Sequence, residues 1–314
     1  MLGRNAAGIF WMFRYLERSE NTARIMQAGH RMFLTNNNSS YEDWASILDA
    51  MSLRDHFENK TAGFNHAKVR NFVLRDADNP SSIISCVTNA RENARMVRTV
   101  LTKEVFEAVN ETYLVLKDTL KRPISDRNLV KTLATIRRQS VLVRGTLHGT
   151  MLRNDIYEFA RLGTFLERAD YTTRILDMKY YILLPSISFV GSSIDNRHWE
   201  NILHSVSAYK SYRWLNEYQI NPRGICKFLI LDPRFPRSLI FCARQLTTNL
   251  RLLTKEYNRK SKSAKLARSI SKNLDASTID DIFEHGLHEF LRDWIANLNR
   301  LSIQIENDFR FYPT

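Results

Sequence analysis

Residues that interrupt helices or cross-link chains are scarce in this sequence. It has 10 glycines, 7 prolines and 3 cysteines among 314 residues. Apolar side chains recur at a spacing near 3.6 residues almost throughout, so the sequence predicts an all-α protein. The cysteines form no CxxC motif and no Cys/His cluster. We therefore expect free thiols in a reducing cytoplasm, with Cys86 and Cys242 buried as small apolar residues.

Long apolar runs are missing as well. The segment YYILLPSISFVG at 180–191 is too short to span a bilayer and contains a proline. The opening segment MLGRNAAGIFWMFRYLERSE passes from apolar to charged residues within a few positions, which indicates a helix rather than a signal peptide. The sequence therefore predicts a cytoplasmic protein without a membrane segment.

Motifs of known chemistry are also absent. The sequence has no GxGxxG loop, Walker loop, GxSxG elbow or Cys–His arrangement. We therefore expect no cofactor and no activation of ATP by this chain alone, and the catalytic residues are unknown. The segment FEHGLHEF spaces Glu284 from His288, and His285 from Glu289, by one helical turn, which can suit a metal. A second ligand set is missing, so we expect capping and packing there, and no metal site.

A long internal repeat is what the sequence does contain. Glu17-Arg18 and Glu167-Arg168 lie 150 positions apart, and the same offset aligns six further identical residues around them. Residues 72–95 resemble residues 228–251 at an offset of 156, with Phe, Asp, Pro, Ser, Cys, Asn and Arg identical. Four matches at an offset of 155 lie between these blocks, and they pair Trp44, Ile47, Leu48 and Ser52 with Trp199, Ile202, Leu203 and Ser207.

Both halves of the chain therefore run in the same order. We expect one domain over residues 1–314, built as an internally duplicated helical bundle of two pseudo-equivalent lobes, with repeats at 1–150 and 151–314. Polar loops are expected at 35–40, 121–126 and 191–197, and a basic linker at 258–263. The segment 227–233 resembles a strand, but its repeat partner reads equally well as a short helix and turn. Helices are expected near 4–33, 41–53, 64–75, 80–102, 104–120, 125–147, 153–184, 196–214, 222–231, 236–257, 263–273 and 277–310.

A charged stripe runs along the first helix of each repeat. At 100° per residue, Glu20 and Arg24 fall within about 60° of Glu17. The second repeat carries the same stripe at Glu167, Asp170 and Arg174. Arg18 and Arg168 fall about 100° from the glutamates, at the margin of the apolar face. Each of these arginines must find a carboxylate or backbone carbonyls, because an unpaired buried charge is prohibitive.

Two interpretations of the stripe remain open. One is a solvated helix face with a structural arginine bridge. The other is a polar cleft that both copies share about a pseudo-twofold axis. In such a cleft the arginines bind the carboxylate or phosphate of an anionic or amino-acid-like ligand. The glutamates bind an amine of the ligand or act as a base. Changing Glu17 and Glu167 to glutamine should then abolish function but spare stability. The candidate cleft residues are Glu17, Arg18, Glu20, Arg24, Asn93, Arg95, Glu167, Arg168, Asp170, Arg174, Asn249 and Arg251.

Positive charge dominates the composition, with a net charge of +13 and a pI near 9.7. Residues 251–272 hold eight Lys or Arg against one acidic residue, Glu256, and a similar excess runs from Lys121 to Arg144. Such stretches can bind phosphate backbones or an acidic protein surface. The first stretch has Tyr257 as its only aromatic residue and no groove-reading motif, which disfavours nucleic acid and favours an acidic partner or solvated basic loops.

Taken together, several segments resemble the bacterial alpha-E family. They are GIFWMFRYLERSENTARIM, DNPSSIISCVTNARENAR, MLRNDIYEFARLGTFLERADYTTRILDMKYYILLP, SVSAY, FLILDPRFPRSLIFC and GLHEFL. The resemblance covers nearly the whole chain. Its departures are Phe13-Arg14, where members usually have a glycine before the arginine, and long polar segments at 258–273.

The resemblance implies an all-helical domain with a Glu-Arg signature and no assigned catalytic residue. Alpha-E members typically occur beside, or fused to, a circularly permuted ATP-grasp protein and a transglutaminase-like cysteine protease. The implied role is an accessory subunit or partner of an ATP-grasp ligase system in the synthesis or modification of peptides or amino-acid derivatives. The alternatives are an independent enzyme that uses the paired Glu/Arg cleft for acyl or amide transfer, or a basic protein that binds nucleic acid or an acidic partner.

Overall fold

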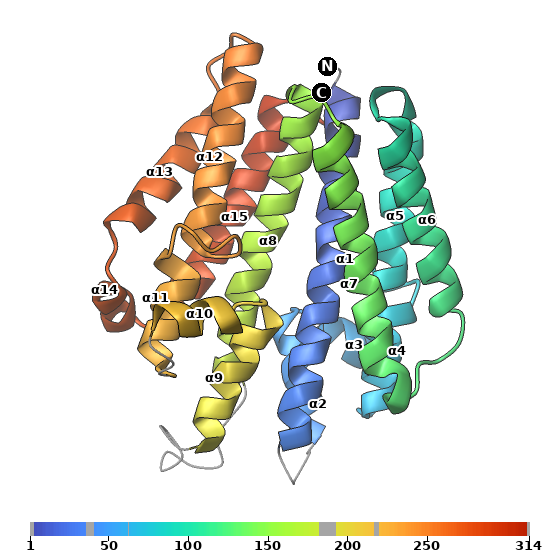
Figure 1. The fold of residues 1–314 in the computed structure, drawn as a ribbon, viewed down its shortest axis with the longest axis vertical. Helices are drawn as coiled ribbons and strands as arrows, with labels where there is room; N and C mark the ends of the chain where they lie inside the picture. Colours follow the sequence, from blue (N-terminus) through green and yellow to red (C-terminus); the bar gives the residue numbers. More distant parts are fainter. Residues whose placement is uncertain (1–2, 36–40, 62, 182–192, 217–219, 313–314) are drawn as a thin grey trace.

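The protein is helical throughout the residues that the structure describes. The computed structural model describes residues 3–35, 41–61, 63–181, 193–216 and 220–312. Within these ranges it contains fifteen α-helices, one short 3-10 helix and no strand (Figure 1). The expected all-α fold is confirmed. Among the described residues, no helix is both long and apolar enough to cross a membrane.

Two long helices, α1 (Gly3–Thr35) and α8 (Asp155–Tyr181), form the centre of the molecule. They lie side by side and run in the same direction, from the end of the molecule that carries both termini (Figure 1). Apolar residues of both helices, such as Phe13 and Phe165, are almost fully buried. Neighbouring helices cover both sides of this pair, so α1 and α8 carry polar residues into the interior only where those residues find partners.

Each central helix has its own set of covering helices (Figure 1). On one side, α5 (Ile83–Met96) and α7 (Asp126–Thr150) pack on α1, and α6 (Lys103–Thr119) packs on both of them. On the other side, α12 (Leu239–Glu256) and α15 (Leu287–Asp308) pack on α8. There α13 (Lys262–Ala276) lies against both. The two sides of the bundle therefore share one helix order.

Two further helices cross between the sides. The helix that follows α1, α2 (Tyr41–Ala50), packs against α8, and the helix that follows α8, α9 (Ser193–Ser205), packs against α1. Each half of the chain thus covers the central helix of the other half. These matched arrangements support the internal duplication, which we retain as a proposal.

Short helices complete the connections. Helix α4 precedes α5, and α11 occupies the matching place before α12. The first turns of α5 and α12 are capped by the side chains of Ser82 and Ser238. The shorter helices are α3 (Arg54–Lys60), α4 (His66–Arg75), η1 (Arg98–Val100), α10 (Tyr209–Leu215), α11 (Pro222–Leu231) and α14 (Ile279–His285). The segment 227–231 belongs to α11, so the helical interpretation of that segment is confirmed.

Some expected helices are divided in the structure, and some helices lie where none was expected. The single helix expected at 196–214 is divided into α9 and α10 around Ser207, whose φ of 60° cannot continue a helix. Gly286, with φ 101°, divides the helix expected at 277–310. Helix α9 begins at Ser193, inside the expected 191–197 loop, and α3 was not expected. The loop expected at 35–40 begins at Thr35, which the structure assigns to the end of α1, and its residues 36–40 lie outside the described residues.

The close approach of α1 and α8 depends on a glycine. A Cβ on Gly163 of α8 would clash with the carbonyl oxygen of Phe10 and would lie 3.3 Å from the backbone nitrogen of Arg14. We expect Gly163→Ala to lower the free energy of unfolding by about 1–3 kcal/mol, because the helices must separate to admit a methyl group. Urea denaturation followed by circular dichroism measures this change.

Gly145 of α7 provides the matched control. A Cβ there would meet nothing within 4 Å. Since alanine is the better helix former, Gly145→Ala should raise stability by roughly 0.5–1 kcal/mol. Equal effects of the two substitutions would show that the α1–α8 contact is not tightly packed at Gly163.

Candidate functional site

The two Glu-Arg dipeptides meet each other across the α1–α8 contact. The guanidinium of Arg18 binds Glu167 through two contacts, Nε to Oε1 at 2.6 Å and Nη2 to Oε2 at 3.1 Å. In the reciprocal pair, Arg168 binds Glu17 through Nε to Oε1 at 2.9 Å and Nη2 to Oε2 at 3.1 Å. Both pairs use the paired geometry in which arginine binds a carboxylate most strongly. Because the helices are parallel, exchanging α1 with α8 exchanges one pair for the other.

Three further arginines contact the same carboxylates. Arg14 donates from Nε to Glu167 Oε2 at 2.9 Å. Arg144, on α7, donates from Nη1 to Glu17 Oε2 at 2.9 Å. Arg237, just before α12, places Nη1 3.1 Å from Glu17 Oε1. These three arginines were not among the candidates, although Arg14 stands inside an apolar run, where a charge must have a partner.

Glu20 extends the cluster by one helical turn. Its Oε1 accepts from Nε and Nη2 of Arg24, at 2.9 and 2.8 Å, and from Nη2 of Arg237 at 2.6 Å. Its Oε2 lies against Arg144 Nη1, although this nitrogen is not aligned for a hydrogen bond to it. We call this set the Glu-Arg network: Arg14, Glu17, Arg18, Glu20, Arg24, Arg144, Glu167, Arg168 and Arg237. It joins three carboxylates to six guanidinium groups.

The second charged pair of each helix fastens the crossing helices. Arg174, paired with Asp170 at 2.6 Å, donates from Nη1 to Ser52 Oγ at 2.9 Å, just beyond α2. Arg24 donates in the same way to Ser207 Oγ at 2.9 Å, just beyond α9. The two serines have φ of 54° and 60°. Each half of the chain is thereby linked to the central helix of the other.

The remaining candidates lie apart from the Glu-Arg network. Asn93 donates to Asn89 O within α5 at 2.8 Å. Arg95 and Arg251 are exposed. Asn249 is buried and donates to Glu158. The structure therefore brings together the candidates on α1 and α8, and it does not join those on α5 and α12 to them.

Burial and charge together determine the ionisation of the network. Glu17, Glu20 and Glu167 are at most 1% exposed. Burial alone would raise the pKa of Glu167, but Arg18 and Arg14 outweigh it and lower the pKa to about 2. Arg168, Arg144 and Arg237 likewise hold the pKa of Glu17 well below its ordinary value. All three carboxylates are thus ionised at neutral pH.

The network has more guanidinium groups than carboxylates, and this excess of positive charge mainly affects the pKa of Arg237. Burial, followed by repulsion from Arg24, lowers the pKa of Arg237 to about 9, although Glu20 and Glu17 act in the opposite direction. The side chain of Arg144 remains 16% exposed and that of Arg18 remains 20% exposed. The network therefore combines buried carboxylates with two arginines that reach its edge.

This arrangement is suited to holding helices together. A general acid must carry a proton, and a general base must have a free lone pair within reach of substrate. The network carboxylates are ionised, and each is shared by at least two guanidinium groups. The buried cysteines are no better placed for chemistry, because burial raises the pKa of Cys86, Cys226 and Cys242 to about 12.

The histidine spacing near the last helix does not form a metal site. Gly286 separates α14 from α15, so Glu284 and His288 are not neighbours on one helix. His288 Nδ1 instead lies 2.7 Å from Asp177 Oδ1 of α8. Among the residues that the structure describes, no group of three His, Cys, Asp or Glu side chains is placed to hold a metal.

The first prediction from the network concerns stability. We expect Glu17→Gln and Glu167→Gln each to lower the free energy of unfolding by about 3–5 kcal/mol, because each leaves buried arginines without their counter-charge. Because these glutamates are buried, we no longer expect glutamine to spare stability, as the sequence had suggested.

Urea denaturation measures the change. Glu107→Gln on the exposed face of α6 is the control and should change stability by no more than about 0.5 kcal/mol. Equal effects of buried and exposed substitutions would contradict a stabilising network.

The second prediction concerns pH. The pKa of Glu167 is about 2 in the folded protein against an ordinary value of 4.5. Its ion pairs therefore stabilise fully above pH 4.5, and this contribution is lost as the pH falls from 4.5 towards 2. The stability difference between the wild type and Glu167→Gln should shrink over the same range. Gly145→Ala changes no titratable group, so its difference should not depend on pH. A difference for Glu167→Gln that stays constant down to pH 2.5 would refute the assignment.

Comparison with known families gives one match. The family model for Alpha-E, described as a predicted alpha-helical domain with a conserved ER motif, matches residues 1–309. Neither a curated protein nor a solved structure matches the chain. The only Glu-Arg dipeptides in the sequence are the two that pair between α1 and α8. Because the match covers nearly the whole chain, this protein belongs to the Alpha-E family.

Proposed function

We propose that this Alpha-E protein is a cytoplasmic accessory subunit of an ATP-grasp ligase system and that it performs no chemical step itself. The partner is a circularly permuted ATP-grasp protein, which supplies the nucleotide chemistry. The substrate is a peptide or an amino-acid derivative, and a transglutaminase-like protease is a further candidate partner. The choice of partner rests on the family resemblance, and the choice of a non-catalytic role rests on the Glu-Arg network.

The observation that carries the non-catalytic role is the reciprocal binding of the two Glu-Arg pairs. Each glutamate of a pair is bound by the arginine of the other pair, and both glutamates are buried. A catalytic pair would direct at least one of these groups towards a substrate. Here both pairs are used to hold α1 against α8. The signature dipeptides thus favour a rigid helical body over an enzyme for acyl or amide transfer.

A surface for an acidic partner lies on α13. Its exposed face carries Lys262, Lys265, Arg268 and Lys272. Figure 1 shows α13 at the outer edge of the bundle, where a second protein can approach it. No carboxylate of the described residues forms an ion pair with these four side chains. Clustered cations of this kind speed association with a negatively charged partner and make the binding sensitive to salt.

Co-purification with the ATP-grasp protein encoded beside this chain, followed by calorimetry, tests the proposal. We expect a stable complex whose affinity falls by about tenfold or more in the double variant Lys265→Glu and Arg268→Glu, because these changes cancel the positive charge of the exposed face. The control is Arg127→Glu with Lys131→Glu, which makes the same charge change on exposed positions of α7. It should bind as the wild type does.

Two results would contradict the proposal. One is the absence of a complex, with or without ATP and amino acids, at protein concentrations of about 100 μM, where even weak specific pairs associate. The other is turnover of an acyl or amide substrate by the isolated protein. If the protein instead binds duplex DNA or RNA tightly, and the α13 variant weakens this binding, the basic face of α13 is a nucleic-acid-binding surface, as in the alternative function.

A further inference from the structure

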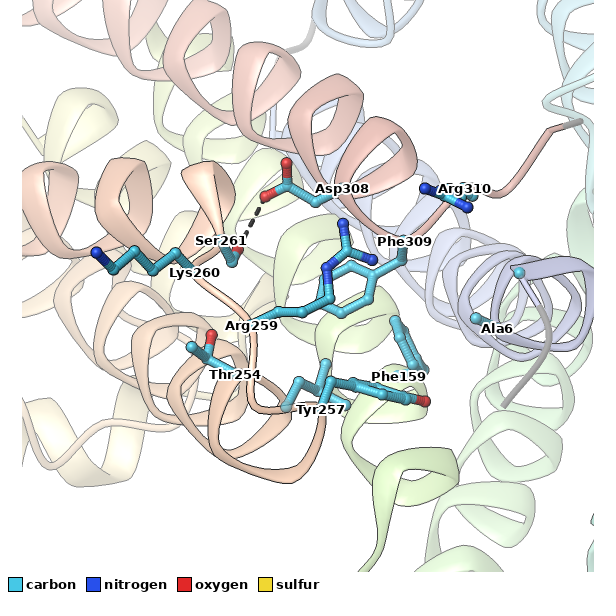
Figure 2. Close-up of a pocket in the computed structure, with 12 residues that line it drawn as sticks. Ala6, Phe159, Thr254, Tyr257, Arg259, Lys260, Ser261, Asp308, Phe309 and Arg310 are labelled. Carbon is cyan, nitrogen blue, oxygen red and sulfur yellow. Dashed lines mark hydrogen bonds between the residues drawn. The ribbon is translucent and has the colours of Figure 1, made fainter. Parts of the chain in front are cut away.

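A pocket lies where the ends of three helices meet, beside the start of α13. It is bounded by the last turns of α12 and α15, the first turns of α1, and α8 (Figure 2). Its volume is about 340 Å³. This is within the range of pockets that hold small organic ligands. None of its lining residues belongs to the Glu-Arg network.

Aromatic rings form one wall of the pocket. Phe159 and Phe309 are in edge-to-face contact, with ring centroids 4.9 Å apart. The ring of Tyr257 lies 6.1 Å from that of Phe309. Tyr257 is fixed in place because its hydroxyl donates to Asp155 Oδ2 at 2.5 Å. Tyr257 and Phe309 are partly exposed and provide an apolar surface against which a flat group can pack, while the buried ring of Phe159 supports Phe309.

Two arginines also line this pocket. Figure 2 shows the side chain of Arg259 extending across Phe309, Arg310 on the side nearer Ala6, and Lys260 pointing away from the pocket. Neither arginine forms an ion pair with a carboxylate of the described residues, and both are exposed. They come from different segments, Arg259 from the linker after α12 and Arg310 from the end of α15. Two arginine side chains from different segments thus line one pocket.

Among the described residues that line the pocket, the one carboxylate is already occupied. Asp308 Oδ2 accepts from Ser261 Oγ at 2.8 Å and from the backbone nitrogen of Ser263 at 2.7 Å. Its Oδ1 accepts from Gln304 Nε2 at 2.8 Å. Asp308 therefore caps the start of α13 rather than neutralising Arg259 or Arg310. The donors of the two arginines remain available to an external anion.

The backbone at Arg310 supports a role in binding. Its φ is 53°, in the left-handed region that glycine or asparagine usually occupies after a helix. The matching position after α12 is Asn258, with φ 45°. Gly3 allows close approach here, because a Cβ on it would clash with the carbonyl oxygen of Arg310. An arginine thus occupies a site that suits glycine better, which points to a use for its side chain.

From these observations we infer that the pocket binds a small organic anion, in which a carboxylate or phosphate is attached to a flat aromatic group. The anion lies between Arg259 and Arg310, and the aromatic group packs on Tyr257 and Phe309. Guanidinium groups bind both carboxylates and phosphates through paired donors. The inference does not depend on the partner proposed above, because the pocket is complete within this chain.

Calorimetry with matched probes tests the inference on the intact protein. The charged probes are adenosine monophosphate and N-acetylphenylalanine, and their controls are adenosine and N-acetylphenylalanine amide. At least one charged probe should bind with a Kd of about 1 mM or tighter and at least tenfold more tightly than its control, with an affinity that falls as salt increases. Which probe binds distinguishes a phosphate from a carboxylate ligand. If neither does, the inference is wrong.

Arg310→Gly separates binding from folding. This substitution removes the guanidinium and relieves the left-handed backbone, so the affinity should fall at least tenfold while Tm rises by about 1–2 °C. Arg259→Gln should weaken binding to a similar extent. Asn258→Gly changes the matching position without removing a cation and should leave the affinity unchanged. Wild-type affinity in Arg310→Gly, or equal losses in Arg310→Gly and Asn258→Gly, would overturn the inference.

Discussion

A charge buried in a protein interior must be paired, and the packing of α1 against α8 depends on how this chain meets that requirement. Each central helix carries a glutamate that its own arginines do not neutralise. Arg18 and Arg14 instead approach Glu167, while Arg168, from the opposite helix, binds Glu17. Neither helix can bury its charged residues without the other. The pairing therefore fixes both the direction of the two helices and their alignment.

The rest of the bundle follows from this centre. Arg144 connects α7 to the network, and Arg237 connects the start of α12. Arg24 and Arg174 continue it to the ends of α9 and α2 through Ser207 and Ser52. A centre held by so many directional contacts is rigid, whereas the exposed charges of α13 and the pocket at the helix ends lie at the periphery. Because the interior groups are committed to one another, only groups at the surface remain free to contact a ligand or a partner.

Much of this arrangement could be predicted from the sequence. The spacing of apolar residues gave the helices, and the repeated Glu-Arg dipeptide identified the two segments that meet. The angular position of Arg18 and Arg168 showed that each needed a carboxylate or backbone carbonyls as partner. The sequence could not show which glutamate each would choose, because that depends on the parallel alignment of α1 and α8. It also could not reveal Arg237, which reaches Glu17 from a distant segment, or the breaks at Ser207 and Gly286, which depend on local backbone conformation.

The crossing of α2 and α9 has a consequence for how the chain can be divided. One helix of each half packs on the central helix of the other half. A cut between α7 and α8 would therefore separate α1 and α8 from each other, and each of them from the helix, α9 or α2, that the other half packs on it. Two copies of one half could, however, exchange these same elements with each other about a twofold axis. The helices of this chain are thus arranged as in a domain-swapped dimer with its two halves in one polypeptide, which supports the proposed internal duplication.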